Sequence, residues 1–256
     1  MSFTYKAGTI PVILLNLHDG NKHYNCAIRS KLSNGVPKKS WVIDNDTRTS
    51  SITNSVYSTL SEKGYKPYVL INNVHRSDID LNRSLSDACA VKCEQCVGYY
   101  IQFHNKLFKL IAAINNKFGR CLIFDIHGNR HSKNLIQFGY NIGKYDLLNG
   151  NHANNSFSHS LSKYPSYDYL LGEKSLSYFY TGLFDNVFPV YNKVTDAYLI
   201  KSNSKYYGGR QKMMEYKDAA DIVLVELSKD LREDPSTPNR LAIGLIDYLK
   251  NVYLNL

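Results

Sequence analysis

Three short apolar runs constrain the fold of this chain more than any other feature. Residues 11–17, 67–72 and 121–126 each have the length of one β-strand, and stretches with helical patterning separate them. Strands that alternate with helices pair in parallel, because each helix returns the chain to the same end of the sheet. Runs that are apolar throughout indicate strands buried on both faces. We therefore expect a three-layer αβα sandwich with a mixed, mostly parallel sheet, built as a single domain from residues 1–256.

The remaining elements are predicted from their end signals. Asp44 or Asp46 can cap a helix at 46–63, and Gly64 can take the left-handed position after it. A long helix at 84–117 ends at Gly119. The later elements that we expect are strands at 135–142, 185–191 (an edge strand, because it contains Pro189) and 221–227, a closing helix at 241–254, and loops at 22–43 and 144–165.

The five cysteines are predicted to be reduced. Their number is odd and the chain begins without a secretion signal, which argues against a disulfide framework. Cys89, Cys93 and Cys96 have a spacing that iron–sulfur proteins also use, but such clusters need thiolates on a loop. Within a long helix these spacings place the three on one face, where cysteine packs as a small apolar side chain.

The charge pattern argues against a dedicated nucleic-acid-binding segment. The net charge is +9, but no run of five or more like charges occurs, so nucleic acid is an unlikely partner. A basic surface that attracts carboxylate substrates fits equally well. The apolar runs are too short to span a bilayer, and no signal peptide precedes them. We expect a soluble cytoplasmic protein with no membrane partner.

Polar residues follow three of the predicted strands directly. His18, residues 74–83 and His127 come where these strands end, and ligands bind beyond the carboxyl ends of strands in such sheets. Two histidines and one carboxylate can hold zinc and leave one position open for water. The acid could be Asp44, Asp19 or Asp125, and Asp125 could instead orient a histidine from behind. The alternative is that both histidines are ordinary turn residues.

Two further sets of residues could act on a substrate. Asn82 and Arg83 could hold a substrate carboxylate, with Arg76 beside them and Asp80 orienting one of them, since a guanidinium matches a carboxylate. The alternative is a surface salt-bridge network. Glu226 interrupts an apolar strand and must face solvent, a partner or a site. In a cleft it could act as a general base; otherwise it points outward from an edge strand.

Six short segments in a fixed order resemble one family. The sequence is similar to the N-formylglutamate amidohydrolase-like family, which shares its fold with zinc carboxypeptidases. The resemblance runs from about residue 11 to residue 249. Its segments are residues 17–21 (Leu-His-Asp-Gly-Asn), 44–48 (Asp-Asn-Asp-Thr-Arg), 75–83 (His-Arg-Ser-Asp-Ile-Asp-Leu-Asn-Arg), 124–131 (Phe-Asp-Ile-His-Gly-Asn-Arg-His), 207–210 (Tyr-Gly-Gly-Arg) and 225–227 (Val-Glu-Leu).

This resemblance implies a metal-dependent amidohydrolase. Zn²⁺ would be the cofactor, and the substrate a small molecule or peptide end that carries a carboxylate. The implied roles are zinc ligation by His18, His127 and Asp44, carboxylate binding and carbonyl polarisation by Arg76, Asn82 and Arg83, and activation of water by Glu226.

The sequence also departs from the family pattern. Leu17 and Asp19 replace the usual Pro and Gly, and Asn21 stands where zinc carboxypeptidases carry Glu. These departures support an alternative, a family member that binds a ligand or metal without turnover.

Overall fold

The structure is a computed structural model. It describes residues 3–26, 29, 32–33, 36–37, 42–90, 93–130, 134–142, 146–147, 149, 155–157, 166–192, 197–199 and 213–255. Our predictions for residues 207–210 and His131, and for most of the loops at 22–43 and 144–165, lie outside the described residues.

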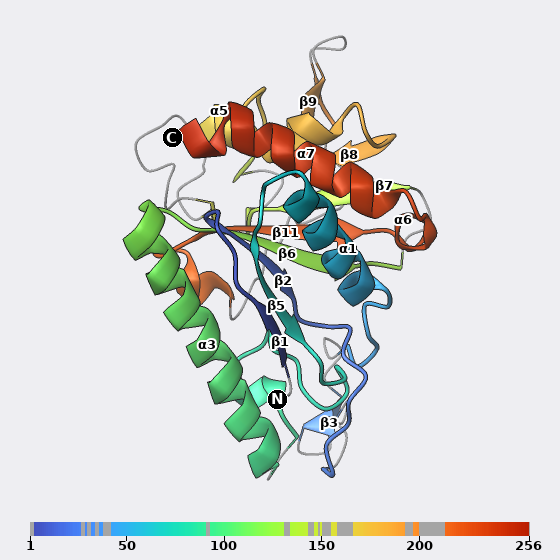
Figure 1. Ribbon diagram of the computed structural model, residues 1–256. Helices are drawn as coiled ribbons and strands as arrows, with labels where there is room; N and C mark the ends of the chain where they lie inside the picture. The colour runs from blue at the N-terminus through green and yellow to red at the C-terminus, as the bar shows by residue number, and fades with distance from the viewer. Residues whose placement is uncertain are drawn as a thin grey trace.

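A mixed sheet of seven strands forms the centre of the molecule (Figure 1). The strands in spatial order are β1 (Phe3–Lys6), β5 (Tyr68–Asn72), β2 (Val12–Asn16), β6 (Leu122–Gly128), β11 (Asp221–Leu227), β7 (Leu135–Gly139) and β8 (Asn186–Phe188). The four strands β5, β2, β6 and β11 run parallel to one another. β1 is antiparallel to β5, and β7 is antiparallel to β11. The predicted mixed, mostly parallel sheet is confirmed.

Helices cover both faces of this sheet. α1 (Thr49–Glu62) and α7 (Thr237–Asn251) pack on one face, and α3 (Glu94–Phe118) packs on the other (Figure 1). Alternate residues of β2 divide between the two layers, because side chains along a strand point to opposite faces. Val12 and Leu14 pack with α1 and α7, whereas Ile13 and Leu15 pack with α3. The αβα sandwich is therefore confirmed.

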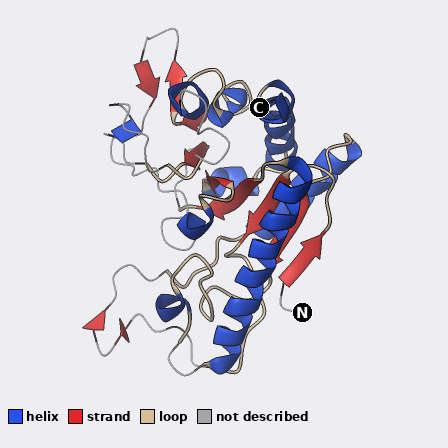
Figure 2. Ribbon diagram, turned by 90° about the vertical axis from the view of Figure 1, so that its left-hand side faces the viewer, coloured by secondary structure: helices blue, strands red, loops and turns tan. Residues whose placement is uncertain are grey.

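Shorter elements complete the described part of the chain (Figure 2). They are α2 (Leu85–Ala88), α5 (Ser166–Leu170), α6 (Lys229–Glu233), the 3₁₀ helices Leu176–Tyr180, Met213–Tyr216 and Tyr253–Asn255, and the two-stranded ladders of β3 (Leu32–Ser33) with β4 (Val36–Pro37) and of β9 (Val190–Asn192) with β10 (Ala197–Leu199). None of the helices described here has both the length and the apolar character needed to cross a membrane.

Several predicted ends are confirmed. Gly64 (φ 85°) directly follows the C-cap of α1, and Gly119 (φ 76°) is the C-cap of α3. Both lie in the left-handed region, where a residue with a β-carbon would be strained. The predicted strand at 185–191 is divided into β8 and β9 at Pro189. β8 is an edge strand of the sheet, as the proline predicted.

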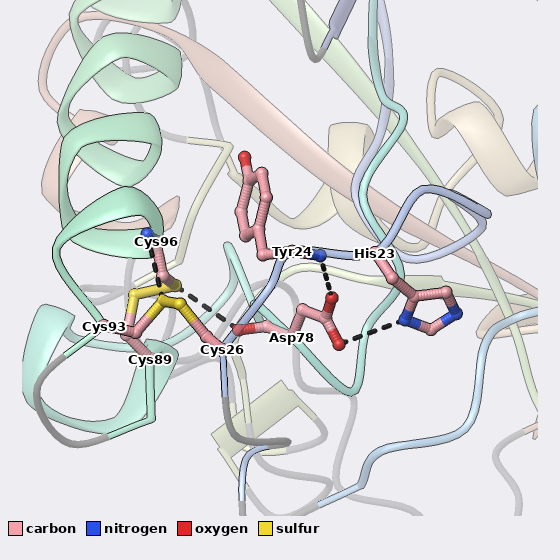
Figure 3. The surroundings of a disulfide bond; sticks show 7 residues. All are labelled: His23, Tyr24, Cys26, Asp78, Cys89, Cys93 and Cys96. Atoms are coloured by element: carbon pink, nitrogen blue, oxygen red, sulfur yellow. Dashed lines mark hydrogen bonds and ion pairs between the residues drawn. A yellow bond between two sulfur atoms is a disulfide. The ribbon is translucent and has the colours of Figure 1, made fainter.

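The prediction of one helix over 84–117 is wrong, because α2 ends at Ala88 and α3 begins at Glu94. The prediction of reduced thiols is also wrong for four of the five cysteines. Disulfides join Cys26 to Cys93 and Cys89 to Cys96 (Figure 3), while Cys121 is buried and free. Cys93 caps α3, because its sulfur accepts a hydrogen bond from the Cys96 amide at 3.4 Å. The spacing of three and four residues could not show that Cys26, which is 67 residues away, meets this turn.

Candidate metal centre

The candidate site lies where the parallel strands end. His18 follows β2 and residues 74–83 follow β5, while His127 and Glu226 are each the last residue but one of their strands, β6 and β11. Glu226 is the register neighbour of His127 in the parallel pair of β11 and β6. The sheet therefore brings together residues that are more than 200 positions apart, at the edge that the sequence predicted.

Three side-chain atoms that could bind a metal ion converge among buried residues at this edge. The Nδ1 atoms of His18 and His127 lie 3.0 Å apart, and Asp46 Oδ2 lies 3.3 Å from the first and 3.1 Å from the second. All three residues are buried, and in the described ranges they are the one group of three or more His, Cys, Asp or Glu side chains that could hold a metal ion. Zinc bonds of about 2.0–2.1 Å in a tetrahedral centre separate ligand atoms by roughly 3.3–3.4 Å. The triangle needs to open only slightly to hold such an ion.

A second carboxylate faces the other ring nitrogen of each histidine. His18 Nε2 lies 2.8 Å from Asp80 Oδ1. His127 Nε2 lies 2.9 Å from Asp125 Oδ2, a close charge contact that falls outside hydrogen-bond geometry. A carboxylate behind a histidine fixes the ring orientation and makes the inward nitrogen a better ligand. The orienting role considered for Asp125 matches its position, and Asp80 plays the same part for His18.

The acid of the triangle is Asp46, and the expectation for Asp44 is corrected. Asp44 is exposed and its carboxylate pairs with Arg130. The Asp46 amide donates to the His18 carbonyl at 2.9 Å, which turns the Asp46 side chain toward the histidines. The two acids are two residues apart on an irregular segment, so the sequence pattern could not decide which one points inward.

Asp19 is the other acid that the sequence left open. Its Oδ2 accepts a hydrogen bond from the Ser50 amide at 2.8 Å, in the first turn of α1. Asp19 thus satisfies a free N–H group at the helix start, the capping role that we had expected of Asp44 or Asp46. Its described contacts are with α1 and not with the two histidines.

Two buried arginines hold the carboxylates. Arg76 Nη1 donates to Asp46 Oδ1 at 3.0 Å, and its Nε donates to Asp80 Oδ2 at 3.4 Å. Arg29, which is 1% exposed, places Nη1 3.7 Å from Asp80 Oδ2 and donates to the Arg76 carbonyl at 2.9 Å. The sequence contained no signal for Arg29, because it lies in a segment that read as loop. Arg76 thus contacts both Asp46 and Asp80, whereas Arg29 contacts Asp80 alone of these two acids.

Asn82 and Arg83 also belong to this site. The backbone N–H of Asn82 donates to Asp80 Oδ1 at 3.0 Å, and Arg83 Nε lies 3.6 Å from Asp80 Oδ2. Because Asp80 is fully buried, this is not the surface salt-bridge network considered as the alternative. Asn82 Oδ1 is buried and has no hydrogen-bond partner among the described residues. A buried acceptor without a partner is a suitable contact for a substrate N–H group.

Glu226 lies in an interior strand, so the alternative of an outward-facing acid at a sheet edge is wrong. β11 is flanked by β6 and β7, and Glu226 is only partly exposed. Burial raises the pKa of Glu226, and the nearby His127 offsets this only in part. Its Oε2 has no hydrogen-bond partner in the described part of the chain. A carboxyl group with a raised pKa beside a metal-ligand cluster is typical of a general base.

Charge–charge contacts set the protonation of the cluster without metal. Burial opposes the charge on Asp46, but the hydrogen bonds to His127 and His18 hold its pKa well below the usual range. Burial likewise opposes the charge on His127, but Asp125 and Asp46 hold its pKa well above 6.5. A metal ion at Nδ1 must displace the proton of His127, so metal affinity is expected to rise with pH.

Comparison with solved structures confirms the fold. The chain is similar to N-formylglutamate amidohydrolase from Ralstonia eutropha JMP134, with a TM-score of 0.51 and 13% identity over 96% of this chain and 95% of that one. It is also similar to the gene product Atu2144 from Agrobacterium tumefaciens, with a TM-score of 0.55 and 13% identity over 97% of this chain and 92% of that one. No protein-family model and no curated protein sequence matches. The two solved structures therefore share the fold of this chain.

Proposed function

We propose that this chain is a zinc-dependent hydrolase that cleaves an amide bond in a small substrate carrying a carboxylate, such as an N-formyl or N-acyl amino acid or a peptide end. One observation carries the proposal: the buried triangle of His18, His127 and Asp46 beside Glu226. The fold shared with an N-formylglutamate amidohydrolase supports it.

The donor set of the triangle fits zinc. Two imidazole nitrogens and one carboxylate oxygen are a frequent ligand set for catalytic zinc, which keeps a fourth position open. Asp80 and Asp125 behind the two histidines complete the arrangement. When bound, zinc would supply a Lewis acid that polarises a carbonyl group and lowers the pKa of water.

Glu226 is the residue that moves protons in this proposal. Its raised pKa suits a carboxylate that accepts a proton from the attacking water and then donates it to the leaving amine. The register places it next to His127, on the strand beside a proposed ligand.

Arg83, Asn82 and Arg76 would bind the substrate. Arg83 provides a planar cation for a carboxylate, and Asn82 Oδ1 provides an unpaired acceptor for an amide N–H. Arg76 would polarise the scissile carbonyl, although its Nη1 and Nε also serve Asp46 and Asp80.

A substrate panel tests the proposal. Zinc-loaded wild type should hydrolyse at least one N-formyl or N-acyl amino acid, lose the activity to a chelator and regain it with added zinc. The matched variant Glu226→Gln should keep its zinc and lose turnover. Stoichiometric zinc without hydrolysis of any compound would instead support the alternative of a ligand-binding family member without turnover.

A further inference from the structure

Arg232 joins two segments that the sequence analysis did not connect. It lies in α6 and is only 9% exposed. Its Nη1 donates to the carbonyl of Thr47 and, at 2.9 Å, to the Thr47 hydroxyl. Its Nη2 donates to the Asn129 carbonyl at 3.0 Å. One guanidinium group therefore bridges the segment before α1 and the turn after β6.

Both acceptors stand next to proposed zinc ligands. Thr47 directly follows Asp46, and Asn129 is two residues after His127. Arg232 itself follows β11, the strand that carries Glu226. From this geometry we infer that Arg232 is a positioning residue, which fixes the Asp46 segment against the His127 strand. The inference rests on the proposed function, because it assumes that these residues hold the metal.

The base of this bridge is anchored to the sheet. The Arg232 amide donates to the Ser228 carbonyl at 3.1 Å. Ser228 is fully buried, and it exchanges bonds with Leu135 in β7: its amide donates to the Leu135 carbonyl at 2.9 Å, and its hydroxyl accepts from the Leu135 amide at 3.0 Å. Arg232 thus starts from a fixed point, which a positioning residue requires.

Gly128 provides the space for this guanidinium group. A β-carbon on residue 128 would lie 2.6 Å from Arg232 Nε and 2.8 Å from its Cζ. Gly128 is in β6 and its φ is outside the left-handed region, so its backbone accepts any residue. The requirement for glycine between His127 and Asn129 therefore comes from Arg232 itself, and a side chain there would displace the bridge.

The experiment measures zinc affinity by competition with a chromophoric chelator, together with the Co²⁺ absorption spectrum and the melting temperature of the metal-free protein. The variants are Arg232→Ala, Arg232→Lys, Gly128→Ala and the double variant Gly128→Ala/Arg232→Ala. The control is Arg240→Ala, since Arg240 also pairs with a carbonyl and an acid, at Leu183 and Asp234 outside the site. Arg232→Lys keeps most of the buried stem but cannot reach both carbonyls as a planar fork can.

We expect Arg232→Ala and Arg232→Lys to weaken zinc binding about 10–100-fold, as loss of a group that supports a ligand does. Gly128→Ala should weaken it similarly in the wild-type background and change nothing once Arg232 is alanine, since the two act through one contact. Arg240→Ala should leave the zinc affinity and the Co²⁺ spectrum unchanged, whatever its melting temperature. Equal affinity in the Arg232 variants and the control, or additive effects of Gly128→Ala and Arg232→Ala, would overturn the inference alone. A wild-type protein that binds no zinc would overturn the proposed function and this inference with it.

Discussion

Asp46→Asn, with Asp44→Asn as its matched control, tests which acid completes the metal centre. The two substitutions remove the same charge at positions two residues apart. Asp46 Oδ2 lies 3.3 Å and 3.1 Å from the two Nδ1 atoms, whereas Asp44 is exposed and pairs with Arg130. Only the first substitution therefore replaces a charged side chain of the proposed metal site with a neutral amide.

The expected effect on zinc binding follows from these contacts. Loss of a group behind a ligand costs about 10–100-fold in affinity, so loss of Asp46 itself should exceed about 100-fold, or roughly 2.7 kcal/mol. Asp44→Asn should change the affinity less than about fivefold, because an exposed ion pair contributes at most about 1 kcal/mol. Both changes in zinc affinity are to be measured by chelator competition at fixed pH and low chloride.

The same variant has a signature in stability that needs no metal. Neighbouring groups hold the pKa of Asp46 well below its ordinary value, so its ionised form stabilises the folded state above about pH 4, and this stabilisation is lost as the pH falls further. Metal-free Asp46→Asn should melt below wild type at pH 7, with a gap that narrows in acid. Zinc binding that survives Asp46→Asn and disappears in Asp44→Asn would refute the geometry from which both numbers are worked.

Three further predictions concern other parts of the structure. Asp125→Asn should weaken zinc binding about 10–100-fold while leaving one zinc per chain at saturation, because it removes the carboxylate behind His127; an unchanged affinity would contradict that role. Glu226→Gln should raise the neutral-pH melting temperature of the metal-free protein, since a carboxyl group with a raised pKa stabilises the fold only while protonated; a melting temperature that falls would argue against a penalised charge. Cys26→Ser/Cys93→Ser should lower the unfolding free energy in urea by about 4 kcal/mol, because that disulfide spans 67 residues; the same denaturation curve before and after the change would mean that the cross-link is absent in solution.

The strand pattern predicted most of the fold and the place of the site. Apolar runs that end in His18 and His127 put two ligand candidates at the same edge of the sheet, because parallel strands share their carboxyl ends. Glu226 was predicted as a candidate general base because burying an acid within an apolar strand is energetically costly. These features depend on local patterning, which the sequence displays directly.

The missed features depend on contacts between distant segments. Asp46 replaces Asp44 because its amide pairs with His18, a residue 28 positions earlier. The Cys26–Cys93 disulfide and the contacts of Arg29 likewise join segments that no periodicity links. An arginine in a loop looks the same in a sequence whether it is exposed or, like Arg29, fully buried.

The most direct test of the metal centre is anomalous diffraction at the zinc edge from crystals of the zinc-loaded protein. We predict one strong peak per chain, about 2.0–2.1 Å from the Nδ1 atoms of His18 and His127 and bound by Asp46. Asp80 and Asp125 should remain on the Nε2 side of the two rings. A peak at Nε2 of either histidine, at the cysteines of the α3 turn or nowhere in the chain would contradict it.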